Sequence, residues 1–140
     1  MSAFNPHRWP IRVYYEDTDF GGIVYYANYL KFIERARSEM VREAGVDQRA
    51  MKAAGLVFAV RRVEAEYLSA AHYDDQLTVE TRLERLSGAR FVMAQAVLRE
   101  AQTLFEAKVE IVCLAESGRP ARIPAEIRQK IAALAPDVTG

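Results

Sequence analysis

Two carboxylates, Asp17 and Asp19, stand directly before the glycine pair Gly21-Gly22 in the segment 13–38. A carboxylate can attack a carbonyl carbon itself or activate a water molecule for that attack. The glycines permit positive φ, so the backbone can turn sharply and approach a bound molecule. A helix is expected to begin shortly afterwards, and its first amides lack intrahelical acceptors and lie at the positive end of the helix dipole. The segment therefore predicts a site at which an ester or thioester carbonyl is attacked and its oxyanion is held.

The helix that follows this turn is the clearest element of the sequence. It is expected from about Ala27 to Ala44, with Asn28 as a possible N-cap and Gly45 as its C-terminal stop. Its apolar stripe, at helical spacing, consists of Tyr29, Leu30, Phe32, Ile33, Ala36, Met40 and Val41. Its polar face consists of Lys31, Glu34, Arg35, Arg37, Arg42 and Glu43. A helix with one apolar stripe needs a sheet that curves around it.

Strand patterns surround the helix. Residues 1–9 are expected to form an irregular arm, followed by a strand from Pro10 to about Glu16. A short helix is expected around residues 47–54 and a C-terminal helix from Pro124 onward. Period-two alternation predicts four strands between these helices, at Leu56–Leu68, Gln76–Leu86, Ala89–Glu100 and Thr103–Ala115. Tight turns at Ser87-Gly88 and at 100–103 require the last three strands to be antiparallel.

The bulk composition indicates one folded domain over residues 1–140, and it disfavours several classes of site. Nineteen basic and nineteen acidic residues cancel, and no basic run suggests a nucleic-acid binder. Cys113 is the only cysteine and there are two histidines, so neither a disulfide nor a metal site is expected. No apolar signal region or transmembrane run is present, and a cytoplasmic location is expected.

Segment 12–37, RVYYEDTDFGGIVYYANYLKFIERAR, resembles the signature of hotdog-fold acyl-CoA thioesterases. More narrowly, it is similar to the YbgC-like branch of the 4-hydroxybenzoyl-CoA thioesterase family. The segment FAVRRVEAEYLSAAHYDDQLTVET, with its Tyr-Asp-Asp turn at residues 73–75, is similar to the next strands of that family, and the likeness covers roughly residues 8 to 124. It implies an α+β hotdog fold, in which a curved five-stranded antiparallel sheet wraps around one long helix.

The resemblance also implies roles for particular residues. Asp19 corresponds to the catalytic aspartate of the family, which acts as nucleophile or general base. The backbone amide of Tyr26 corresponds to the hydrogen-bond donor to the thioester carbonyl. Tyr15 matches a tyrosine that lines the pocket. Some relatives carry histidine where this chain has Tyr26, which leaves the amide role intact. Asp17 is interpreted as structural.

Substrate and partners are implied in the same way. The substrate would be an acyl-CoA, with no bound cofactor, and coenzyme A would lie across a subunit interface of a homodimer or homotetramer. Gly22, Arg85, Ser87 and Arg90 are the candidate substrate-binding residues. Similar proteins are associated with acyl carrier protein and with the Tol-Pal envelope system. The sequence leaves open both the length of the acyl chain and whether the acyl group is aliphatic or aromatic.

Two other functions are possible on the same fold. A hotdog hydratase or dehydratase would use a histidine beside a carboxylate, and no histidine occurs between Ile11 and Glu66. A protein that binds acyl-CoA or acyl carrier protein without catalysis would keep the pocket, but it would have no need of Asp19.

Overall fold

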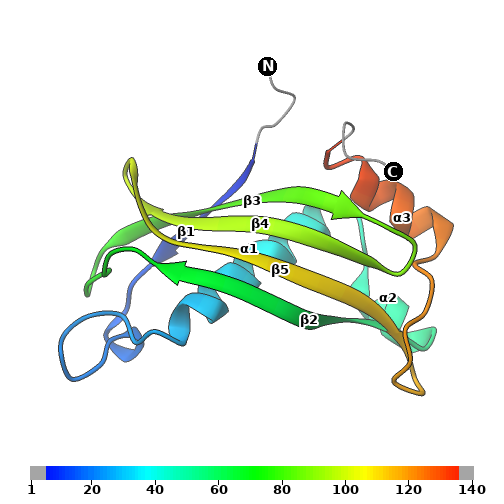
Figure 1. Cartoon of the computed structure of the whole chain (residues 1–140), viewed down its shortest axis with the longest axis horizontal. Coiled ribbons are helices and arrows are strands. Elements are labelled where there is room, and N and C mark those ends of the chain that lie inside the picture. Colours follow the sequence, from blue (N-terminus) through cyan, green and yellow to red (C-terminus); the bar gives the residue numbers. More distant parts are fainter. Residues whose placement is uncertain (1–5, 136–140) are drawn as a thin grey trace.

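The computed structural model describes residues 6–135, which form one curved sheet with three helices. Figure 1 shows the elements in chain order. They are β1 (His7–Arg12), the 3-10 turn η1 (Tyr15–Asp17), α1 (Asn28–Glu43), α2 (Gln48–Ala53), β2 (Leu56–Tyr67), β3 (Gln76–Leu86), β4 (Arg90–Arg99), β5 (Gln102–Ala115) and α3 (Ala125–Ala132).

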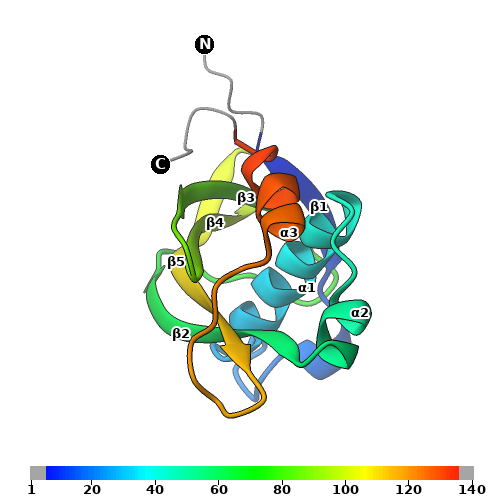
Figure 2. The same ribbon diagram turned by 90° about the vertical axis from the view of Figure 1, so that its right-hand side faces the viewer.

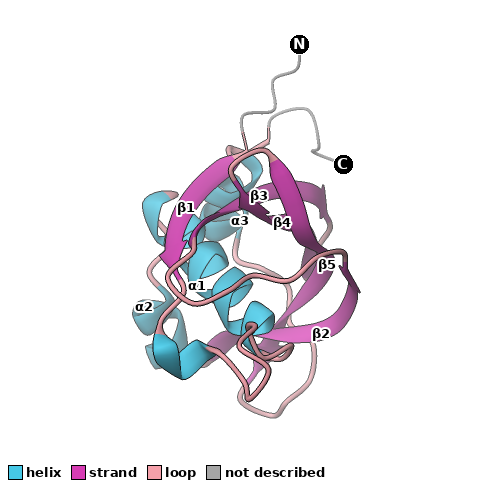
Figure 3. Ribbon diagram, turned by 90° about the vertical axis from the view of Figure 1, so that its left-hand side faces the viewer, coloured by secondary structure: helices cyan, strands magenta, loops and turns pink. Residues whose placement is uncertain are grey.

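The strands lie in the order β1-β3-β4-β5-β2, and every neighbouring pair is antiparallel. Hairpins join β3 to β4 and β4 to β5, whereas β2 pairs with β5 rather than with β3, the next strand in the chain. The sheet curls around α1, and the helices gather on one side of it (Figures 2 and 3). This is the α+β hotdog arrangement that the sequence resemblance implied, and β1 and β2 are its two edges.

The core lies between α1 and the inner face of the sheet. Phe32, Ile33 and Ala36 of the helix are fully buried, together with Phe105 and Val109 of β5. Each predicted member of the apolar stripe is buried except Leu30, which is 40% exposed. The amphipathic pattern of the helix therefore determines which way α1 faces.

A polar network crosses this core where the helix stripe predicted only apolar contacts. Gln95 of β4 donates to the carbonyl of Ile33 and to Oγ1 of Thr81, each at 2.9 Å. Arg37 Nη1 donates to Gln95 Oε1 at 3.0 Å, so the placement of Arg37 on a purely polar face was wrong. Burial lowers the pKa of the Arg37 guanidinium, and nearby Glu34 opposes that shift. Because every buried polar group in the network has a partner, it fixes the position of α1 along the sheet.

The N-terminal boundaries differ from those expected. β1 begins at His7, inside the expected arm, and residues 15–17 form a 3-10 turn rather than the end of a strand. Pro10 is tolerated within β1 because this strand is at the edge of the sheet, where a missing amide is least costly. The turn forms because the carboxylate of Asp17 accepts a hydrogen bond from the amide of Tyr14.

The other boundaries agree with the sequence within one residue. The two expected hairpins are present, with Glu100 at a φ of 53° in the second. Gly45, at a φ of 92°, follows the end of α1 as predicted. Asn28 is not the N-cap of α1, however, since Ala27 occupies that position and makes no side-chain cap.

Candidate active site

Asp17 links the loop after β1 to the start of α1. Besides the carboxylate contact with Tyr14, its carbonyl accepts hydrogen bonds from the Tyr25 amide and from Nδ2 of Asn28, both at 2.9 Å. Asn28 therefore ties the helix to the loop instead of capping it. With only 9% of its surface exposed, Asp17 fits the structural role expected of it.

Asp19 lies on the loop between the paired residues Thr18 and Val24, and its side chain is exposed. Its backbone closes the loop, because its amide donates to the carbonyl of Ile23 and its carbonyl accepts from the amide of Gly22. Oδ1 accepts the amide of Gly21 at 2.9 Å, and among the described residues Oδ2 has no hydrogen-bond partner. The turn that brings the amide of Gly22 to the carbonyl of Asp19 requires a φ of 82° at Gly22, a conformation in which a residue with a side chain would be strained. The loop therefore orients one carboxylate oxygen and leaves the other available.

The backbone just before α1 offers a free donor. Among the residues that the structure describes, none accepts a hydrogen bond from the amide of Tyr26. The carbonyl of the same residue accepts the hydroxyl of Tyr67, from β2, at 3.0 Å. The two rings also meet edge to face, with centroids 6.1 Å apart. Tyr67 was not singled out in the sequence, because its pairing with Tyr26 arises only when β2 reaches the start of α1.

Segment 70–75 contacts the loop that carries Asp19 and holds it through backbone hydrogen bonds. The amide of Val24 donates to the carbonyl of Ala71, and Ile23 forms a β-bridge with His72. The amide of Ala71 in turn donates to the buried hydroxyl of Tyr29, a residue of α1. Loop, support and helix are thus joined by consecutive hydrogen bonds, which positions Asp19 relative to the helix N-terminus.

Asp75 and Arg99 hold that supporting segment in place. Oδ2 of Asp75 accepts the amide of His72 and Nη1 of Arg99, each at 2.8 Å, and Arg99 also donates to the carbonyl of Ala70. Burial raises the pKa of Asp75, but the hydrogen bonds from His72 and Arg99 outweigh it, so that the pKa is lowered. The Tyr-Asp-Asp turn was visible in the sequence, whereas its link to Arg99 was not.

A lowered pKa makes the contribution of Asp75 to stability dependent on pH. An unfolded aspartate titrates near a pKa of about 3.9, so the stabilisation is complete above that pH and is lost as pH falls through the lower folded value. We expect Asp75→Asn to melt at a lower temperature than wild type at pH 7, with the difference shrinking below about pH 4. Melting temperatures at pH 7 to 3 would measure this; a difference that does not change with pH would contradict it.

Aromatic side chains surround the loop and are exposed to solvent. Tyr15 is 83% exposed and meets Tyr73 edge to face, with ring centroids 6.1 Å apart. The others around this end of the sheet are Tyr14, Phe20, Tyr25, Tyr26 and Tyr67. Such a concentration of exposed rings is typical of a surface that a ligand or another chain covers.

Arg85, Ser87 and Arg90 are not brought to Asp19 within one chain. β3 begins beside the supporting segment and runs away from it, so that Arg85 lies about 30 Å further along the strand. Arg90 Nη1 is paired with Glu110 at 3.0 Å, and Ser87 Oγ donates to the carbonyl of Arg90. These residues can serve the same site only if a second chain places its β3–β4 hairpin there.

Two further features are absent from residues 6–135. No group of three or more His, Cys, Asp or Glu side chains in this range is placed to hold a metal ion. No helix in it is both long and apolar enough to cross a membrane.

The chain is similar in sequence and in fold to known thioesterases. Residues 13–131 match the Thioesterase-like superfamily. The chain is 41% identical over 128 residues to the acyl-CoA thioester hydrolase YbgC of Escherichia coli O6:H1, across 87% of this chain and 96% of that protein. It is 39% identical over 127 residues to the acyl-CoA thioesterase YbgC of Haemophilus influenzae, across 89% and 93% of the two chains. A probable thioesterase from Bartonella henselae, 44% identical, superposes with a TM-score of 0.81 over 86% of this chain and all of the other. The chain therefore belongs to the Thioesterase-like superfamily and to its YbgC-like branch.

Proposed function

We propose that this protein hydrolyses acyl-CoA thioesters to a free carboxylic acid and coenzyme A. One observation carries the proposal. The loop holds the carboxylate of Asp19 through the amide of Gly21, and just before α1 the amide of Tyr26 has no acceptor among the described residues. A thioester carbonyl needs these two groups, an activated oxygen and a preorganised donor. The YbgC relatives carry the same activity in their names.

In the reaction, the thioester carbonyl oxygen accepts a hydrogen bond from the Tyr26 amide. This hydrogen bond becomes stronger as negative charge develops on that oxygen. In one version, Asp19 attacks the carbonyl carbon, the C–S bond breaks, and the thiolate of coenzyme A leaves. Water then opens the resulting mixed anhydride and restores the carboxylate. In the other version, Asp19 takes a proton from water as the water oxygen attacks the carbonyl carbon. The C–S bond then breaks, coenzyme A leaves as the thiolate, and Asp19 gives up the proton to that thiolate or to solvent. Tyr15 and Gly22 line the site in both.

The site is expected to be completed by a second copy of the chain. β2 is an edge strand, and it exposes Val57, Val60, Val63 and Tyr67. An unpaired apolar edge favours pairing with another strand, which supports a homodimer. Pairing there would bring a second β3–β4 hairpin closer to the loop, and Arg85, Ser87 and Arg90 would then hold the phosphates of coenzyme A.

The role of the hairpin arginines can be tested by kinetics. Arg85→Ala/Arg90→Ala is expected to raise KM roughly tenfold while kcat changes little, since phosphate contacts are made before and during the chemical step alike. Arg49→Ala/Lys52→Ala is the matched control, because it also removes two exposed positive charges but lies on α2, away from the β2 edge and the hairpin. An unchanged KM in the double variant would show that the β3–β4 hairpin does not bind the substrate.

The activity itself is tested by release of free thiol from a panel of acyl-CoAs, from short aliphatic to long-chain and aromatic. Turnover of any member supports the proposal and gives the substrate class. Turnover of an acylated carrier protein alone would move the substrate from coenzyme A to that carrier. Binding without any turnover would favour a protein that binds acyl-CoA and does not cleave it. Cytoplasmic location and Tol-Pal association stay predictions.

A further inference from the structure

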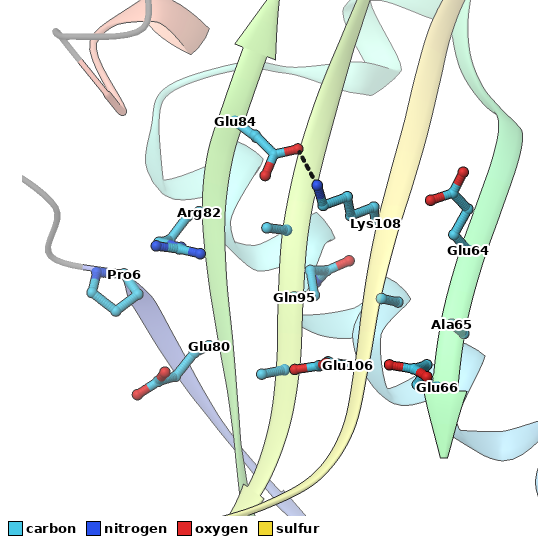
Figure 4. A pocket seen from close by; sticks show the side chains of 13 residues that line it. Pro6, Glu64, Ala65, Glu66, Glu80, Arg82, Glu84, Gln95, Glu106 and Lys108 are labelled. Carbon is cyan, nitrogen blue, oxygen red and sulfur yellow. Dashed lines mark ion pairs between the residues drawn. The ribbon is translucent and has the colours of Figure 1, made fainter. Parts of the chain in front are cut away.

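The amide of Tyr26 lies at an exposed position, where no cavity wall holds it. Its residue is 62% exposed. A hollow of about 880 Å³ lies on the face of the sheet that points away from α1, and Figure 4 shows the side chains that line it. None of these side chains comes from residues 13–28. The direction in which the Tyr26 amide points is therefore set by the hydrogen bonds of the turn that leads into α1.

The Tyr26 amide belongs to the same peptide unit as the carbonyl of Tyr25. This unit is trans, since the described chain has no cis peptide bond, so its N–H and C=O point in opposite directions. The carbonyl of Tyr25 accepts a hydrogen bond from the backbone amide of Asn28 at 2.8 Å. This bond therefore points the Tyr26 N–H away from Asn28, and it polarises the peptide unit so that the N–H is a stronger donor.

Asn28 makes a second contact with its side chain. Its Nδ2 donates to the carbonyl of Asp17 at 2.9 Å, and the same carbonyl accepts the amide of Tyr25, also at 2.9 Å. Among the described residues, Asn28 is the one residue of α1 whose side chain hydrogen-bonds the loop 14–24. Three hydrogen bonds among Asp17, Tyr25 and Asn28 thus form a closed triangle, and this triangle fixes the peptide unit that carries the donor.

The acceptor in this triangle is itself held in place. Asp17 is 9% exposed, and its carboxylate accepts the amide of Tyr14 at 2.8 Å. Asp19 follows Asp17 by two residues, so the same anchor lies next to the carboxylate that is proposed to react. The side-chain contact of Asn28 therefore sets the position of the Tyr26 amide relative to Asp19, as well as its direction.

Asparagine is an unfavourable choice for the first residue of α1 unless its side chain has a task of this kind. It is a weak helix former, because its side chain competes for backbone groups. The usual compensation is N-capping, but Ala27 is the N-cap of α1 and no side chain caps this helix. Asn28 thus departs from what the helix alone favours, which is expected of residues at functional sites.

We propose that Asn28 is a positioning residue, which aims the Tyr26 amide at the carbonyl oxygen of the bound thioester. Its side chain bonds the loop and not the substrate, and it acts through the peptide unit between Tyr25 and Tyr26. The inference rests on the proposed function, because it needs a thioester whose oxyanion this amide stabilises. Such a donor has its full effect only when it is held in advance where the charge develops. A displacement of about 1 Å can lower the rate by up to about 100-fold.

A double-mutant cycle on thiol release tests whether Asn28 acts through the donor. Asn28→Ala is expected to lower kcat by about 10- to 100-fold with KM within about threefold of wild type, because the donor acts mainly in the transition state. In the Tyr26→Pro background, which has no donor to aim, Asn28→Ala should lower kcat by less than a further factor of about two. Equal losses in the two backgrounds, or an unchanged kcat in Asn28→Ala, would overturn the inference.

Asp47→Ala is the matched control, because it also removes side-chain hydrogen bonds at the start of a helix. Oδ1 of Asp47 accepts the amides of Arg49 and Ala50 at 3.0 and 3.1 Å, at the N-terminus of α2. This variant should melt at a lower temperature than wild type and keep the wild-type kcat. If its kcat fell as far as that of Asn28→Ala at a similar loss of melting temperature, lower stability alone would account for the effect, and the inference would fail.

Infrared spectroscopy measures the hydrogen bond itself and needs no turnover. Asp19→Asn would hold intact butyryl-CoA or benzoyl-CoA, isotope-labelled at the carbonyl carbon. The Tyr26 amide should shift the carbonyl stretch to a lower frequency than in the free thioester, and adding Asn28→Ala should remove most of that shift. A shift that survives Asn28→Ala would overturn the inference alone. A bound thioester that shows no shift even with Asn28 present would overturn the proposed donor and the inference together.

Discussion

Asp19→Asn is expected to abolish thioester hydrolysis while leaving the fold and the binding of coenzyme A nearly intact. Asparagine keeps an oxygen that can accept the amide of Gly21, so the loop retains its shape. It can neither attack a carbonyl as an anion nor remove a proton from water. We therefore expect kcat to fall by at least about 100-fold, the scale on which a lost general base or nucleophile is felt. Thiol release measures the rate, and calorimetric titration with coenzyme A measures binding.

Asp74→Asn is the matched control for Asp19→Asn. It removes the same charge from an exposed turn on the neighbouring segment, where a φ of 71° suits asparagine well. This variant should keep the wild-type rate. An Asp19→Asn protein that retained more than about a third of the wild-type rate would exclude the catalytic role, because a lost base costs far more.

Tyr26→Pro is expected to show the second largest effect. Proline has no amide hydrogen, so the substitution removes the proposed donor to the thioester oxygen and nothing else that the reaction needs. Tyr26 lies before Ala27, the N-cap of α1, so a proline there removes no hydrogen bond within the helix, and no described residue accepts a hydrogen bond from the amide that is lost. Removing one oxyanion donor typically lowers kcat by about 100- to 1,000-fold, and we expect a loss on that scale.

Two further variants separate the backbone from the side chain at this position. Tyr26→Phe keeps the amide and loses the hydroxyl, and Tyr26→Ala also loses the ring that meets Tyr67. Both should keep kcat within a fewfold of wild type if the amide is the working group. If Tyr26→Ala lost as much activity as Tyr26→Pro, while both remained folded by circular dichroism, the side chain would be the important part.

The periodic elements were predictable because each period reports which face of a segment is buried. The stripe from Tyr29 to Val41 predicted α1, and alternation predicted β3 at its observed bounds. The predictions failed where a local contact competes with the pattern. Residues 15–17 carry the β-favouring side chain of Tyr15, but the carboxylate of Asp17 caps the amide of Tyr14 and turns the chain. Arg37 was misplaced because a long side chain can leave the polar face and reach a buried acceptor, here Gln95.

The residues of the candidate site also fall into two groups, those that a local segment reveals and those that only the fold brings together. Asp19, Gly22 and Tyr26 are neighbours in the chain, so a single segment could reveal them. The residues that support them come from elsewhere: Ala71 and Asp75 from the segment before β3, Arg99 from the end of β4. No local pattern predicts these contacts, because they form only when strands distant in the sequence pair.

By itself, then, the sequence determined the helix, the strands and the loop that carries the chemistry, because propensity and periodicity act over a few residues. The tertiary structure alone decided that β2 pairs with β5, that segment 70–75 lies beneath Asp19, and that Arg85 lies at the far end of β3 from it. Register and pairing depend on how the whole sheet closes around α1, and that is a property of the folded chain.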